Sequence, residues 1–145
     1  MKLPSTAQRV AWNTSEKGNA KIREKTLRSI ERTIENEDLE GAFRRLDREW
    51  DTERVLETNA AVLLLLSLSL GVFRDRRWLW LTGGVAAFLL QHALQGWCPP
   101  LPVLRALGVR TAGEIGAERS ALKALRGDFT AAGDAETALR AAEWE

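Results

Sequence analysis

Apolar positions gather in two neighbouring runs near the middle of the chain. The first run, residues 58–73, has sixteen uncharged residues and is apolar around the whole circumference of a helix. As a helix it would extend about 24 Å, and Val55 and Leu56 lengthen its apolar pattern. The second run has no charged residue from Trp78 to Leu104. The pattern predicts two helices, about 55–73 and 78–98, each suited to crossing a bilayer.

The segment between the two runs favours an antiparallel pair of helices. Only residues 74–77, with the sequence RDRR, separate them, which fits a tight helical turn. Trp78 and Trp80 at one end of the second run, and Trp97 at the other, are spaced like an interfacial aromatic belt. Prolines from Pro99 onward should end the second helix near Trp97 or Cys98. The alternative is the two-helix core of a soluble protein, with the tryptophans as ordinary packing residues.

Both flanks are densely charged and carry amphipathic helical patterns. The sequence predicts three segments: residues 1–54, a hairpin at 55–104, and residues 105–145. One apolar stripe contains Ile22, Leu27, Ile30 and Ile34, and a second contains Leu39, Phe43, Leu46 and Trp50. The second stripe is expected to lead without a break into the first apolar run. A third helix should close at Gly127, with a loose tail after it that has at most a weak helix. The fold class is therefore an all-α membrane protein, a two-helix transmembrane hairpin with flanking amphipathic cytosolic helices.

Composition and motifs exclude several classes of function. The formal net charge of +1 provides no basic field for phosphates, so we expect no nucleic-acid partner. The sequence has no glycine-rich phosphate loop, no nucleophile elbow and no Cys/His cluster with metal-ligand spacing. It therefore predicts no enzyme activity, no catalytic residue, no metal and no cofactor.

The arginines near the two apolar runs help to predict how the hairpin is oriented across the membrane. Three lie in the turn, but more lie on the outer sides of the two runs: Arg44, Arg45, Arg48, Arg54, Arg105, Arg110 and Arg119. Positively charged loops stay in the cytoplasm. The balance favours a multi-pass protein with both termini in the cytoplasm.

The stretch GWCPPLPVLRALGVRT, residues 96–111, begins at the end of the second predicted helix and resembles part of a known protein family. Its residues Gly96, Cys98, Pro99, Leu104, Gly108 and Thr111 resemble the YgaP-like transmembrane family, small two-helix inner-membrane domains of unknown function that are sometimes fused to rhodanese sulfurtransferases. The resemblance covers about residues 54–111. It implies a hairpin in the bacterial inner membrane, cytosolic termini and dimerisation. The 145 residues contain no rhodanese domain, and the long charged N-terminal segment departs from the minimal family pattern.

Polar and small residues within the hairpin are the candidate helix-packing residues. Gly83, Ala87, Gln91 and Gln95 recur every fourth position on the second helix. Small residues allow helices to approach closely, and glutamines can form hydrogen bonds across the contact. Asn59 stands as far before the turn as His92 stands after it. The two should therefore lie at similar depth, in a hydrogen-bonded cluster with Gln91.

Two single side chains support alternative interpretations. Cys98 is a possible thiol site, either a buried structural residue or a redox, persulfide-carrying, metal-binding or lipid-modified thiol. A cysteine after a helix C-terminus lacks the cation or helix N-terminus that would lower its pKa. His92 is a possible haem or chlorin ligand, or else a neutral histidine satisfied by a neighbouring helix.

The leading functional hypothesis follows from location rather than chemistry. It is a small non-enzymatic integral membrane protein that acts as a dimerising module or as an accessory or assembly subunit of a larger membrane complex. Its expected partners are the lipid bilayer and either a second copy or the subunits of that complex. The alternatives are a sulfur or redox accessory protein using Cys98 and a haem- or chlorin-binding subunit using His92.

Overall fold

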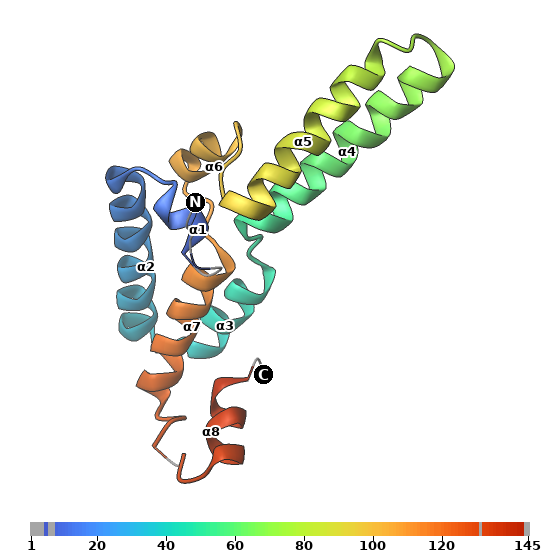
Figure 1. Ribbon diagram of the computed structural model, residues 1–145. Helices are drawn as coiled ribbons and strands as arrows, with labels where there is room; N and C mark the ends of the chain where they lie inside the picture. The colour runs from blue at the N-terminus through green and yellow to red at the C-terminus, as the bar shows by residue number, and fades with distance from the viewer. Residues whose placement is uncertain (1–4, 6–7, 131, 144–145) are drawn as a thin grey trace. The chain divides into compact units, whose positions relative to one another are not determined.

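The computed structural model describes residues 5, 8–130 and 132–143, and every regular element in those ranges is an α-helix. The all-α prediction is confirmed for this part of the chain (Figure 1). The outer ends of the two predicted flanking segments, residues 1–4 and 144–145, lie outside the described residues, as do residues 6, 7 and 131. The helices are α1 (Arg9–Trp12), α2 (Glu16–Asn36), α3 (Leu39–Arg48), α4 (Thr52–Phe73), α5 (Trp78–Gln95), α6 (Leu101–Leu107), α7 (Ala112–Arg126) and α8 (Ala135–Ala142).

The described chain divides into two compact units. The first unit takes in residues 1–22 and 50–111, and the second takes in residues 23–49 and 112–145. Helix α2 begins in the first unit and continues into the second. Helices α4, α5 and α6 belong to the first unit, which therefore contains both apolar runs.

Helix α4 begins at a cap that the sequence analysis did not anticipate. The carboxylate of Asp51 accepts a hydrogen bond from the backbone N–H of Arg54, with 2.7 Å between the heavy atoms. Glu49 and Asp51 have extended backbone, so α3 ends at Arg48 and α4 starts anew at Thr52. The expectation of one continuous helix is wrong, because a capping Asp offers the first N–H groups of α4 a partner that a continuous helix would not need.

Helix α5 ends earlier than expected, at Gln95, and the prolines that follow it lie at the start of another helix, α6. Gly96 terminates α5 in the left-handed conformation with φ of 75°. A Cβ at this position would lie 2.6 Å from the backbone of Arg9, so a side chain is excluded on two grounds. Pro100 caps α6 and Pro102 lies in its first turn, where a missing N–H costs nothing.

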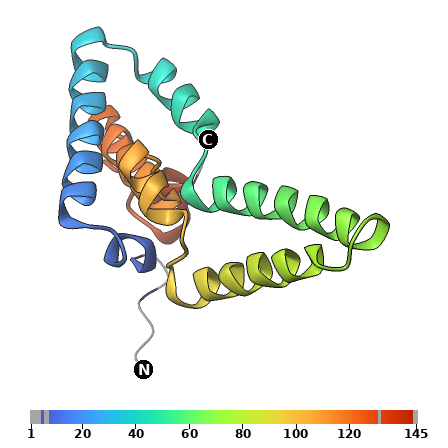
Figure 2. The ribbon, with the colours of Figure 1, turned by 90° about the horizontal axis from the view of Figure 1, so that it is seen from above.

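Helices α4 and α5 lie side by side and run in opposite directions on either side of the turn at residues 74–77 (Figures 1 and 2). Within the described residues, one candidate for a membrane crossing is long and apolar enough: Leu39–Phe73, whose uncharged part, residues 58–73, lies in α4. Only 17% of its apolar window is buried inside the protein. Helix α5 does not meet the same criterion, because its last turns carry Gln91, His92 and Gln95.

The second unit has its own apolar core. Phe43 and Leu46 on α3 pack with Ile115 and Leu122 on α7, and Ile30 of α2 packs against them. Helix α7 ends at Arg126, and Gly127 follows with φ of 92°, as the sequence predicts. The expected loose tail contains α8, which begins at a capping box formed by Asp134 and Thr137.

Candidate functional site

The contact between α4 and α5 has a polar centre. The hydroxyls of Ser67 and Thr82 lie 2.8 Å apart, and Ser67 is buried. One turn farther along α4, Gly71 meets Leu79 so closely that a Cβ would lie 2.5 Å from Leu79 Cδ2. These four residues were not singled out from the sequence. The sequence signal that could have identified them is a serine and a glycine four positions apart on α4, because small residues at this spacing permit close helix approach.

The predicted packing stripe lies elsewhere on α5. Gly83 and Ala87 are exposed, and a Cβ at Gly83 would meet nothing within 4 Å. Gln91 and Gln95 are half-buried, and the backbone carbonyl of Gln95 accepts a hydrogen bond from Asn13 Nδ2 at 2.8 Å. Gly83 and Ala87 thus face away from α4 within this chain, and their contact with a second copy stays a prediction.

The expected hydrogen-bonded cluster of Asn59, Gln91 and His92 does not include His92, whose side chain forms no hydrogen bond with another described residue. Asn59 Nδ2 donates to the carbonyl of Val55 in its own helix, at 2.8 Å. Both imidazole nitrogens of His92 are buried and have no hydrogen-bond partner among the described residues. Asn59 and His92 nevertheless line one cavity.

That cavity, which we call the hairpin cavity, has a volume of about 370 Å³ and lies within the first unit. Its lining has no charged side chain, and only Asn59, His92 and Cys98 contribute polar side-chain atoms. A mostly apolar cavity of this size with a few polar groups has the composition of a small-molecule site. The lining residues are Leu56, Asn59, Ala60, Leu63, Val85, Phe88, Leu89, His92, Cys98, Pro99, Pro100 and Leu104.

Cys98 has the surroundings of a structural thiol. It is buried between α5 and α6 and packs with Val10, Leu56 and Leu101. Burial raises the pKa of the thiol, and a hydrogen bond from the backbone of Leu101 only partly opposes this. The thiolate is the nucleophilic form, so these surroundings disfavour reactivity at neutral pH.

A hydrogen-bonded network ties residues 9–22 to the ends of the hairpin helices. Arg9 forms an ion pair with Glu53 at 2.6 Å and donates to the carbonyl of Ala93 at 3.1 Å. Together with the bond from Asn13 to Gln95, this supplies donors to carbonyls in the last turn of α5 that have no partner inside the helix. On the α4 side, the backbone N–H of Thr52 donates to the carbonyl of Arg110 at 2.8 Å.

Arg105 is a deeply buried charged member of this network, with 2% of its surface exposed. Its guanidinium donates to Thr14 Oγ1 at 3.0 Å, to Asn19 Oδ1 at 3.0 Å and to the carbonyl of Val109 at 3.1 Å. The sequence analysis treated Arg105 only as a topology signal. Its partners in α2 and the preceding turn are 86 and 91 positions away, so no local pattern could have identified them.

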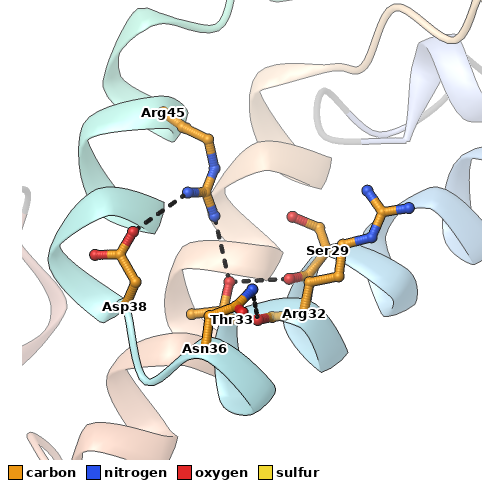
Figure 3. Close-up of a pocket in the computed structure, with 6 residues that line it drawn as sticks. All are labelled: Ser29, Arg32, Thr33, Asn36, Asp38 and Arg45. Atoms are coloured by element: carbon orange, nitrogen blue, oxygen red, sulfur yellow. Dashed lines mark hydrogen bonds and ion pairs between the residues drawn. The ribbon is translucent and has the colours of Figure 1, made fainter.

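The second unit has a smaller polar cavity of about 200 Å³ (Figure 3). Arg45 points into it, with 3.4 Å to Thr33 Oγ1 and 3.8 Å to a carboxylate oxygen of Asp38. Thr33 and Asn36 donate to backbone carbonyls of their own helix. The side chains of Thr33, Asn36, Asp38 and Arg45 are therefore already engaged in hydrogen bonds or an ion pair. Its lining residues are Ser29, Arg32, Thr33, Asn36, Asp38 and Arg45.

Metal binding has no obvious location in the described ranges. No three His, Cys, Asp or Glu residues among them are grouped so that they could hold a metal ion together.

Comparison with known families identifies the segment that contains the hairpin cavity. Residues 51–114 match the model of the inner membrane protein YgaP-like transmembrane domain. Residues 51–114 are a YgaP-like transmembrane domain. The resemblance inferred from the stretch around Cys98 is confirmed, and the matched YgaP-like segment runs from the cap of α4 into the start of α7. The chain is thus a membrane protein with a domain of this family. No curated protein and no solved structure matches the chain.

Proposed function

We propose that α4 and α5 cross a bacterial inner membrane together as a hairpin, with both termini in the cytoplasm. The observation that carries this proposal is the exposed apolar surface of α4, which includes Leu65, Leu66 and Val72. A helix that is apolar on every side needs lipid or protein around it. The family match supports the inner membrane as the location.

The two ends of the hairpin carry different sets of side chains. Phe73 and Trp80, beside the turn, are 88% and 87% exposed. At the opposite end, charged side chains such as Arg9, Glu53 and Arg105 are engaged in the network with residues 9–22. An anchored, charged base and a short turn with exposed aromatic residues support a base in the cytoplasm and a turn at the far interface.

Within this membrane, we propose that the protein acts without catalysis, as a dimerising module or as an accessory subunit of a larger membrane complex. The exposed small residues Gly83 and Ala87 support this role, because they leave a face of α5 open to close approach by another helix. The test is native mass spectrometry of the protein released from its own membrane in lipid nanodiscs. A dimer or a hetero-complex of fixed composition is expected, and a monomer throughout would contradict the proposal.

The two alternatives rest on single side chains. A sulfur or redox role requires a reactive Cys98, and the burial and raised pKa of this thiol do not favour it. A haem or chlorin role requires ligation by His92, whose nitrogens are unpartnered in the hairpin cavity. An absorption spectrum of the purified protein with a Soret band, lost in His92→Leu, would favour the haem alternative over the accessory role.

A further inference from the structure

The imidazole of His92 is an unused hydrogen-bonding group inside a largely apolar cavity. His92 is 5% exposed, and neither ring nitrogen has a partner among the described residues. A neutral imidazole has one donor and one acceptor, and leaving such groups unpaired in a buried place is unfavourable, because they lose their hydrogen bonds to water without replacement. A ligand that supplied an oxygen atom at this position would remove that cost.

The lining of the hairpin cavity defines the rest of the ligand. Nine of its twelve residues, namely all except Asn59, His92 and Cys98, are apolar or proline, and none carries a charge. A carboxylate or phosphate placed here would lose its hydration and find no cation among the lining side chains. Leu63 and Phe88 belong both to the lining and to the exposed apolar surface of the helices, so the cavity opens toward that surface.

We propose that the hairpin cavity binds a neutral, mostly apolar molecule dissolved in the membrane, whose hydroxyl or carbonyl oxygen forms a hydrogen bond with His92. The volume of about 370 Å³ falls in the range of known ligand sites and fits a ring or a chain segment rather than a whole lipid. The proposal rests on the membrane location of the hairpin proposed above. A fatty alcohol and a quinone with an alkyl chain share the required chemistry.

The chain provides its own reporter for this ligand, because His92 is its only histidine. The full-length protein is prepared in nanodiscs with ¹⁵N-labelled histidine, and the imidazole signals are followed as dodecanol, a decyl-substituted benzoquinone or dodecanoate is added. We expect a saturable shift with at least one of the two neutral probes and none with dodecanoate. A shift with dodecanol alone assigns the site to lipid-type hydroxyls, and a shift with the quinone alone assigns it to quinones.

Two variants and a matched control locate the binding. Leu89→Trp fills the cavity from α5 and Ala60→Phe fills it from α4, and both retain His92. Leu90→Trp adds the same bulk at the neighbouring position, which is 62% exposed and outside the lining. We expect the cavity-filling variants that keep the helix content of the wild type to bind the probe about tenfold more weakly or worse, and Leu90→Trp to bind normally.

The proposal is overturned by a shift that grows linearly without saturation, by equal shifts with the neutral probes and dodecanoate, or by no shift at all. It is also overturned if Leu89→Trp and Ala60→Phe respond like Leu90→Trp, because the probe would then only be partitioning into the lipid around the protein. The membrane hairpin itself is tested by labelling of the turn, so the failure of one proposal is distinguishable from the failure of the other.

Discussion

The hydroxyls of Ser67 on α4 and Thr82 on α5 lie 2.8 Å apart, in the half of the hairpin nearer the turn. This hydrogen bond joins side chains of the two helices. In lipid, where apolar surfaces gain little by meeting one another, such bonds and close backbone approach hold helices together. Gly71, one turn away, allows that approach by leaving room for Leu79.

Removing this hydrogen bond should weaken the pairing of the helices by a modest amount. Replacing Ser67 by Ala and Thr82 by Val, singly and together, should give a coupling energy of about 0.6 kcal/mol, the average for such bonds in membranes. The unfolding free energy is measured by steric trapping in bicelles. Ser69→Ala is the control, because Ser69 is exposed and bonds within its own helix. A coupling energy of zero would show that the two hydroxyls do not hold the helices together in the membrane.

Bulk at Ala87 should disturb association between copies without disturbing the hairpin. Ala87→Leu places a large side chain on the open small-residue face, whereas Ala86→Leu makes the same change at an exposed position on another side of α5. We expect Ala87→Leu to reduce the dimer fraction in nanodiscs about tenfold or more, measured by single-molecule photobleaching, and Ala86→Leu to leave it unchanged. Equal dimer fractions in the two variants would exclude this face as the interface.

Cys98 should react slowly with alkylating reagents. Its raised pKa means that the thiolate appears at a higher pH than in an exposed cysteine, for which the midpoint is about 8.5. We expect the rate of Cys98 alkylation by a small maleimide to be low at neutral pH. The rate should still increase at pH values where the rate for an exposed control cysteine has become constant. The control is Arg76→Cys in a Cys98→Ser background, since Arg76 is exposed in the turn. Matching pH profiles for the two cysteines would refute the structural role.

Arg105 should be essential for the stability of the first unit. Arg105→Met keeps much of the side-chain volume but leaves Thr14, Asn19 and the carbonyl of Val109 without this donor. The expected loss is on the order of 3 kcal/mol, measured by thermal unfolding in detergent. Arg140→Met, at an exposed position with an ion pair to Glu136, should change stability by less than about 0.5 kcal/mol. Similar losses in both variants would mean that the Arg105 network contributes little.

The helices were predictable from the sequence because their signals are local. Sixteen uncharged residues and a four-residue turn are enough to indicate α4, the turn and the start of α5. The start of α4 and helix α6 were missed, although Asp51 is a common capping residue and Pro100 and Pro102 occupy positions where helices tolerate proline. In both places a strong apolar or proline pattern outweighed a weaker capping signal.

The candidate site was predictable only in part. Asn59 and His92 line one cavity, but the hydrogen-bonded cluster predicted from their equal distance from the turn is not formed at His92. The sequence could not show that Arg9, Asn13 and Arg105 bind across more than 80 positions. Nor could it show which face of α5 meets α4, because Gly83 and Thr82 are adjacent and both are compatible with close packing.

The most direct test of the membrane hairpin is the accessibility of its turn. Arg76→Cys in the Cys98→Ser background places a single thiol at the exposed turn. Intact cells are treated with a membrane-impermeant maleimide before and after permeabilisation, and Glu136→Cys in the same background serves as the cytoplasmic reference. The hairpin account predicts labelling of the turn from outside the inner membrane, with Glu136→Cys labelled only after permeabilisation. Labelling of the turn only after permeabilisation would contradict it.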